Sequence, residues 1–137
     1  MSRSGYSDDN ENIAMWRGMV ASAIRGKRGQ QFLKELIASL EAMPEKKLIK
    51  NELVTATGEV CALGCVGQAR GLDMTKFDPD EDPEFLAEQL GKAFNIAPCL
   101  AQEVQYLNDE WNYSWTPEQR WAAVHKWAQE NLKEDAS

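Results

Sequence analysis

The segment Gly58-Glu-Val-Cys-Ala-Leu-Gly-Cys-Val-Gly-Gln-Ala-Arg-Gly-Leu72 differs from the rest of the chain in its many small residues. It contains four glycines and two cysteines. Each glycine destabilises a helix by about 1 kcal/mol relative to alanine, so such a run needs a reason. Residues 60–70 are predicted to form a helix that ends at Gly71. Its small side chains would let another backbone approach closely; they are Ala62, Gly64, Gly67 and Ala69.

On both sides of this segment, apolar residues recur at helical spacing. The chain is therefore predicted to be mainly α-helical, a compact bundle of about five to six helices. Whether residues 53–60 form one short β-hairpin stays open. Two helices are expected before this segment, one over residues 10–25 and one that begins after the turn at 26–29 and ends at Pro44. Three more are expected after it, over residues 83–95, 98–111 and 117–132.

Helix boundaries are marked by strong local signals. Asp9 or Asn10 is expected to cap the first helix, and Gly26-Lys-Arg-Gly29 to separate it from an antiparallel second helix. Asp82 before Pro83 predicts a helix start, and Thr116-Pro-Glu-Gln119 is a capping box. Phe85 and Trp111 fall on the inner stripes of their helices.

A chain of 137 residues is expected to form one domain, spanning residues 10–132, with flexible tails at 1–9 and 133–137. No apolar run approaches the roughly 20 residues that cross a bilayer. The polar N-terminus lacks a signal core, so a cytoplasmic location is predicted. Cys61, Cys65 and Cys99 have apolar neighbours and are predicted to be buried free thiols.

The net charge of −7 is unevenly distributed along the sequence. Residues 1–50 contain nine Lys and Arg against six Asp and Glu, and residues 51–137 contain six against sixteen. Two faces of different potential would result if the two halves stay apart in space. Residues 87–104 have the outline of a helix-turn-helix, but the second helix contains Glu103 and no cation. Duplex DNA binding is therefore not expected, because phosphate neutralisation dominates DNA affinity.

Aromatic and acidic residues are the predicted partner-binding surface. Four of the five tryptophans lie between residues 111 and 127, and Trp121 and Trp127 point in different directions on one helix. Exposed tryptophans are common interface anchors, although aromatic residues also fill cores. The predicted partner-binding residues are Trp111, Tyr113, Trp115, Trp127, Asp80, Glu81 and Asp82.

Arg25, Lys27 and Arg28 are predicted to contact an anion, with an exposed basic turn as the alternative. No arrangement typical of a catalytic, metal or cofactor site is present. Residues 78–89 lack the glycine and glutamate of a calcium loop, having Pro83 and Gln89 instead. His125 is the only histidine. The chain is therefore expected not to be an enzyme and to need no cofactor or metal.

Several segments resemble a group of small phage and prophage proteins. These segments are Ile13–Gly18, Ser22–Gln30, Val60–Gly64 with Ala69–Asp73, and Asn108–Glu110 with Thr116–Arg120. The similarity covers residues 12–132 and implies a phage-derived protein acting in the cytoplasm of a bacterial host. That group has no established activity, so no catalytic role is implied.

The leading hypothesis is a non-enzymatic protein that inhibits or modulates a bacterial host or defence complex. The alternatives are a nucleic-acid-associated phage regulator using Arg25–Arg28 with Lys46, Lys47 and Lys50, an enzyme with a hidden site, and a packaging or morphogenesis accessory. Homo-oligomerisation also stays open.

Overall fold

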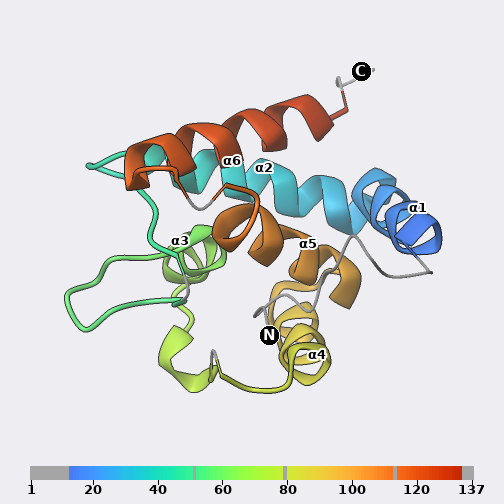
Figure 1. Ribbon diagram of the computed structural model, residues 1–137, viewed down its shortest axis with the longest axis horizontal. Helices are drawn as coiled ribbons and strands as arrows, with labels where there is room; N and C mark the ends of the chain where they lie inside the picture. The colour runs from blue at the N-terminus through green and yellow to red at the C-terminus, as the bar shows by residue number, and fades with distance from the viewer. Residues whose placement is uncertain (1–12, 51, 79, 113, 134–137) are drawn as a thin grey trace.

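The computed structural model describes residues 13–50, 52–78, 80–112 and 114–133. Its described part is a mainly helical bundle, as predicted (Figure 1). The elements are α1 (Ile13–Arg25), α2 (Lys27–Ala42), α3 (Ala62–Ala69), the 3-10 helix η1 (Met74–Lys76), α4 (Pro83–Phe94), α5 (Pro98–Asp109) and α6 (Pro117–Asn131). Some predictions fall outside the described residues. These are the tail 1–9, residues 134–137 of the C-terminal tail, the cap at Asp9 or Asn10, and the role of Tyr113.

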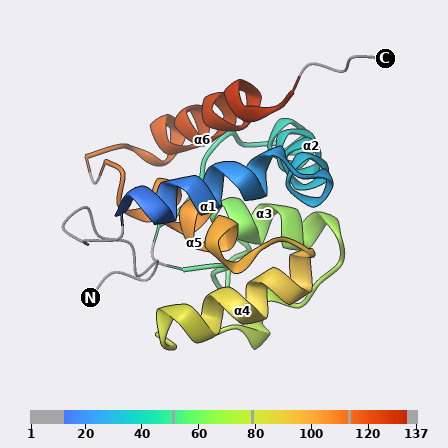
Figure 2. The same cartoon turned by 90° about the vertical axis from the view of Figure 1, so that its right-hand side faces the viewer.

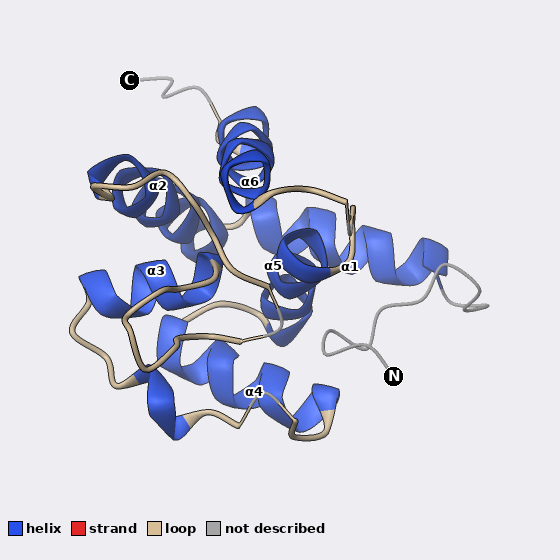
Figure 3. Ribbon diagram, turned by 60° about the vertical axis from the view of Figure 1, so that its left-hand side comes forward, coloured by secondary structure: helices blue, strands red, loops and turns tan. Residues whose placement is uncertain are grey.

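Helix α5 is the central element of the bundle, and α1, α3, α4 and α6 all contact it (Figure 3). Nine of its twelve residues are buried. Leu100, Ala101 and Val104 are completely enclosed. A helix buried on nearly every side must lie inside a bundle. The core is thus arranged around α5. Helix α3 lies against this core, next to α2.

The junction of α1 and α2 differs from the predicted antiparallel pair. Only Gly26 separates the two helices, whereas a helical hairpin needs a loop of 2–5 residues to reverse the chain. Figure 1 shows α2 from the side and α1 nearly end-on, whereas Figure 2 shows α1 from the side and α2 nearly end-on. Gly29 lies inside α2, where an added Cβ would overlap the carbonyl oxygen of Ala23. The junction is therefore a tight corner.

The glycines of α3 allow close packing, as predicted. An added Cβ at Gly64 would overlap the carbonyl oxygen of Leu53, and one at Gly67 would overlap the side chain of Met74. The close neighbours of these two glycines are therefore a loop and the 3-10 helix η1, and not another α-helix. Gly71 follows the helix with a φ of 75°, a left-handed conformation that favours glycine.

Residues 53–60 contain only the start of a hairpin. Val54 and Val60 form a single antiparallel bridge, and the described residues contain no longer strand. The Thr55 N–H donates to Glu59 O over 2.8 Å, and Gly58 adopts a φ of 88° in the turn. This loop folds over α3, because the Cys61 N–H donates to Leu53 O over 3.2 Å.

The predicted helix boundaries at 82–83, 95 and 116 are confirmed. The Asp82 carboxylate accepts from the Phe85 N–H over 3.2 Å, and Asn95 ends α4 with a φ of 57°. Thr116 and Gln119 form the reciprocal capping box of α6. The inward position predicted for Phe85 is wrong, because this residue is 49% exposed. Leu86, Leu90 and Phe94 occupy the buried stripe instead.

No helix among the described residues is long and apolar enough to cross a membrane.

Candidate partner-binding groove

A groove of about 630 Å³ lies between α1, α5 and the C-terminal half of α6. Figure 2 shows α1 and α6 next to each other, with α5 below α1 and partly behind it. We call this site the α1–α5–α6 groove. Its lining residues are Trp16, Arg17, Val20, Ala21, Ile24 and Arg25 from α1, Glu103, Tyr106 and Leu107 from α5, Trp111, and Trp127, Glu130, Asn131, Leu132 and Lys133 from the end of the chain.

Helical periodicity places these side chains on common faces. Val20 and Ile24 are buried and fix α1 on the core. Glu103, Tyr106 and Leu107 are spaced i, i+3 and i+4, so they share one face of α5. The groove is therefore formed by helix faces that are packed on the core.

Gln30 fixes one end of the groove, a role that the sequence did not reveal. Its amide nitrogen donates to the carbonyl oxygens of Ile24 and Asn131 over 2.8 and 3.2 Å. Its amide oxygen accepts from the Lys133 N–H over 2.8 Å. The Lys133 ammonium also donates to Arg25 O over 2.7 Å. The C-terminus of α6 is thus tied to the α1–α2 corner, and we call these contacts the Gln30 latch.

Glu103 is the partly buried carboxyl group in the groove. Burial raises its pKa above the usual value, because the charged form loses hydration. The Arg17 guanidinium and a hydrogen bond from Trp16 act in the opposite direction. Arg17 is thus the cation that faces this carboxyl group.

The predicted tryptophan surface is divided by the structure. Trp111 and Trp115 contact each other edge to face, with ring centroids 5.4 Å apart. Trp111 is 49% exposed and follows the end of α5, so its predicted place on the inner stripe is wrong. Trp127 is half-buried, packs against the core and lines the groove together with Trp111. Trp16 lines the same groove, although no sequence pattern grouped it with them.

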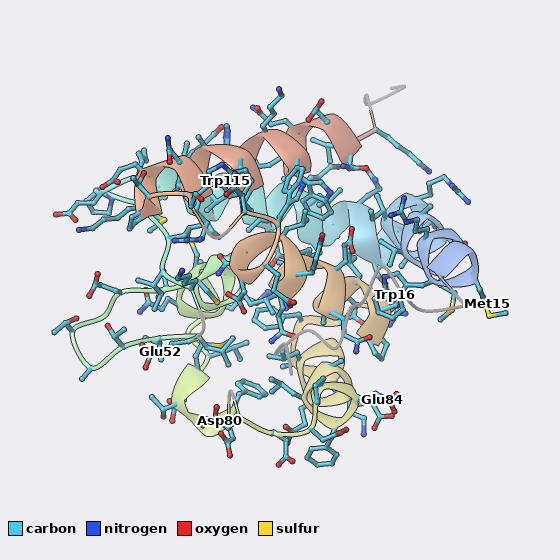
Figure 4. The ribbon with its side chains drawn as sticks, viewed as in Figure 1. Met15, Trp16, Glu52, Asp80, Glu84 and Trp115 are labelled. Carbon is cyan, nitrogen blue, oxygen red and sulfur yellow. The ribbon has the colours of Figure 1, made fainter. Side chains whose placement is uncertain are left out.

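The acidic residues lie away from the tryptophans. Figure 4 shows Asp80 next to η1, in the loop that leads to α4, and Trp115 close to α6, with α3 and α5 between them. The Asp82 carboxylate caps α4, and the Asp78 carboxylate accepts from the Asp80 N–H over 2.9 Å. Asp80, Glu81 and Asp82 therefore do not share one surface with the aromatic residues.

The three predicted anion-binding cations are also separated. Arg25 lines the α1–α5–α6 groove, whereas Lys27 and Arg28 line a different cavity of about 230 Å³. The Arg28 guanidinium donates to the Asn95 side chain over 3.4 Å.

A second basic group lies at the far end of α2. The Lys46 ammonium donates to the carbonyl oxygens of Glu41 and Met43, each over 2.5 Å, and Lys47 pairs with Glu45 over 2.8 Å. The 16 residues of α2 span about 24 Å, so Lys46 and Lys47 do not extend the cationic cluster at its start.

A buried polar network joins segments that lie far apart in the sequence. The Asn108 side chain accepts from the Ala62 N–H over 3.0 Å and donates to Ile49 O over 2.8 Å. Arg120 is 3% exposed and donates to Leu48 O and Trp115 O over 2.9 and 3.2 Å. These residues connect α5 and α6 to the loop before α3, so their role is structural.

Cys61, Cys65 and Cys99 are buried free thiols, as predicted. Burial raises the pKa of the Cys65 thiol to about 11, which disfavours the reactive thiolate. His125 stacks on Trp121 with ring centroids 4.7 Å apart and contacts Glu41 over 2.9 Å. Within the described ranges, His, Cys, Asp and Glu form no group that could hold a metal ion.

Comparison of the chain with protein-family models, curated proteins and solved structures finds no match.

Proposed function

We propose that this chain is a non-enzymatic binding protein and that the α1–α5–α6 groove is its interface with another protein. The groove brings together Trp16, Tyr106, Trp111 and Trp127 with Arg17 and Arg25. Tryptophan, tyrosine and arginine are the residue types that dominate binding energy at protein interfaces. This concentration in one concave site is the observation that supports the proposal.

The construction of the groove also favours binding. Two helix walls rest on α5, and the Gln30 latch holds the end of α6 in place. A prearranged site loses less conformational entropy when a partner binds. Its volume of about 630 Å³ accommodates a few large side chains from a partner.

The resemblance to phage and prophage proteins suggests the setting. We propose that the partner is a protein of the bacterial host, in a host or defence complex that this chain inhibits or modulates. The aromatic groove replaces the mixed acidic and aromatic surface of the sequence hypothesis, because Asp80 and Trp115 lie apart.

A crosslinking pull-down from bacterial lysate tests this function. Trp111→Ala removes an exposed ring of the groove, and Phe85→Ala removes an exposed ring from α4; each of these two residues is 49% exposed. Wild type and Phe85→Ala should recover the same partner, while Trp111→Ala should recover at least about tenfold less, as expected for an interface hot spot.

Thermal unfolding of both variants shows whether they remain folded. Equal recovery by two folded variants would contradict the proposed interface.

A further inference from the structure

We infer that the α1–α5–α6 groove binds an acidic, amphipathic helical segment of the partner protein. This inference rests on the proposed function and adds the chemistry of the partner.

The charges of the groove differ from those of the whole chain. Among the residues that the structure describes, the lining contains three cations, Arg17, Arg25 and Lys133, against the carboxyl groups of Glu103 and Glu130. The chain as a whole has a net charge of −7. The groove is thus a locally cationic site on an acidic protein, which favours a negatively charged segment.

The position of each cation strengthens this contrast. Arg17 acts on Glu103, whose charged form is already disfavoured by burial. The Arg25 guanidinium has no hydrogen bond or ion pair within the described part of the chain. The Lys133 ammonium is held at Arg25 O over 2.7 Å, so a second cation lies next to Arg25. Two cationic groups are thus available at the latched end of the groove.

The length of the groove fits a short helix as the bound segment. On α1 the lining extends from Trp16 to Arg25, a distance of about 14 Å along the helix axis. A partner helix of about ten residues has this length. Its apolar stripe would contact Trp16, Trp111 and Trp127, and its carboxylates would reach Arg25 and Lys133.

A basic segment is the main alternative, because the net charge of −7 attracts cations at long range. In the groove, however, its side chains would approach Arg25 and Lys133. The repulsion between like charges at close range in an interface is stronger than the long-range attraction between the basic segment and the acidic chain.

Three fluorescein-labelled helical peptides of about twelve residues distinguish these possibilities. They share Leu and Phe at the apolar positions and have Glu, Gln or Lys at the polar positions. Anisotropy titrations of the full chain should show the Glu peptide binding at least about tenfold more tightly than the Gln peptide at about 20 mM salt. This preference should fall to about twofold or less at about 0.5 M salt, where screening is strong.

A charge variant locates the preference. Arg25→Gln should weaken binding of the Glu peptide about threefold and leave the Gln peptide unchanged. Lys76→Gln removes one exposed cation from η1, outside the groove, and should alter neither affinity. Hydrogen exchange should show protection of α1 and the end of α6 in the complex.

The possible failures are separable. Equal or tighter binding of the Gln or Lys peptide, with protection of α1 and α6, would overturn the acidic partner and leave the groove as an interface. If no peptide protects α1 and α6, the inferred helical segment is overturned, and the pull-down with Trp111→Ala decides separately whether the groove is an interface.

Discussion

Gly64 shows how one residue can determine the packing of a whole helix. The backbone of α3 passes so close to Leu53 that an added Cβ would overlap the Leu53 carbonyl oxygen. Backbone cannot move aside as a side chain can, so the contact requires glycine. The same carbonyl oxygen accepts from the Cys61 N–H, which fixes the loop in this position.

We therefore predict that Gly64→Ala lowers the free energy of unfolding by about 1–3 kcal/mol, as overpacking does in a core. Gly18→Ala is the matched control. A Cβ at Gly18 meets nothing within 4 Å, so this change within α1 should stabilise the protein by about 0.5–1 kcal/mol. Urea denaturation measures both effects. If Gly64→Ala were as stable as Gly18→Ala, the loop at Leu53 would be able to move away from the added Cβ, and the prediction would be wrong.

Glu103 should make stability depend on pH. Burial raises its folded pKa above the ordinary 4.5, so the folded state favours the protonated carboxyl group. Its stabilising contribution is therefore present below the unfolded pKa and is lost as the pH rises through the folded pKa. Glu103→Gln imitates the protonated form and should gain stability relative to wild type between about pH 4 and pH 7.

Glu88→Gln is the control, since it changes an exposed glutamate of α4. Denaturant unfolding at several pH values measures the difference for each variant. A Glu103→Gln variant that loses stability relative to wild type as the pH rises would mean that attraction to Arg17 outweighs burial.

Elements far apart in sequence are joined by single polar side chains. Gln30, the fourth residue of α2, connects the end of α1 to the end of α6 through three hydrogen bonds. We predict that Gln30→Ala destabilises the protein by about 1–3 kcal/mol, since each net hydrogen bond contributes about 1 kcal/mol. Hydrogen exchange should accelerate at residues 128–133 and remain slow in α5.

Gln31→Ala is a close control for this change. Gln31 is exposed, and its side-chain amide donates to Glu35 on the same helix over 3.4 Å, with no hydrogen bond to another helix among the described residues. If both variants lost hydrogen-exchange protection at the end of α6, the cause would be a weakened α2 and not the loss of the Gln30 latch.

The helix ends were predictable where their signals are local. Asp82 before Pro83 and the Thr116–Gln119 box fix the start of α4 and α6 by hydrogen bonds within one turn. The angle at Gly26 was predicted wrongly, because it depends on the close approach of Gly29 to Ala23. Phe85 was misplaced because periodicity alone does not determine which edge of an apolar stripe meets the core.

At the scale of the whole molecule, the charge division of the sequence does not produce two charged faces. The acidic half supplies α5 and α6, which pack against α1 and α2 of the basic half. Lys27 and Arg28 lie at one end of α2, and Lys46 and Lys47 at the other, about 24 Å away.

We therefore predict no retardation of duplex DNA in a mobility-shift assay at about 50 mM salt, because few cations can contact one backbone together. Lys27→Gln with Arg28→Gln serves as the comparison. A shift by wild type that this double variant abolishes would contradict the prediction and favour a nucleic-acid role for the start of α2.

The sequence by itself determined the helical class, the ends of α4 and α6, and the buried state of the three cysteines. These features depend on hydrogen bonds within one turn and on the period of apolar residues. Only the tertiary structure placed α5 at the centre, separated Asp80 from the tryptophans and brought Trp16 to Trp127 across a groove. Such relations depend on side-chain volumes and on contacts between distant residues, such as Gln30 with Lys133, which no local pattern encodes.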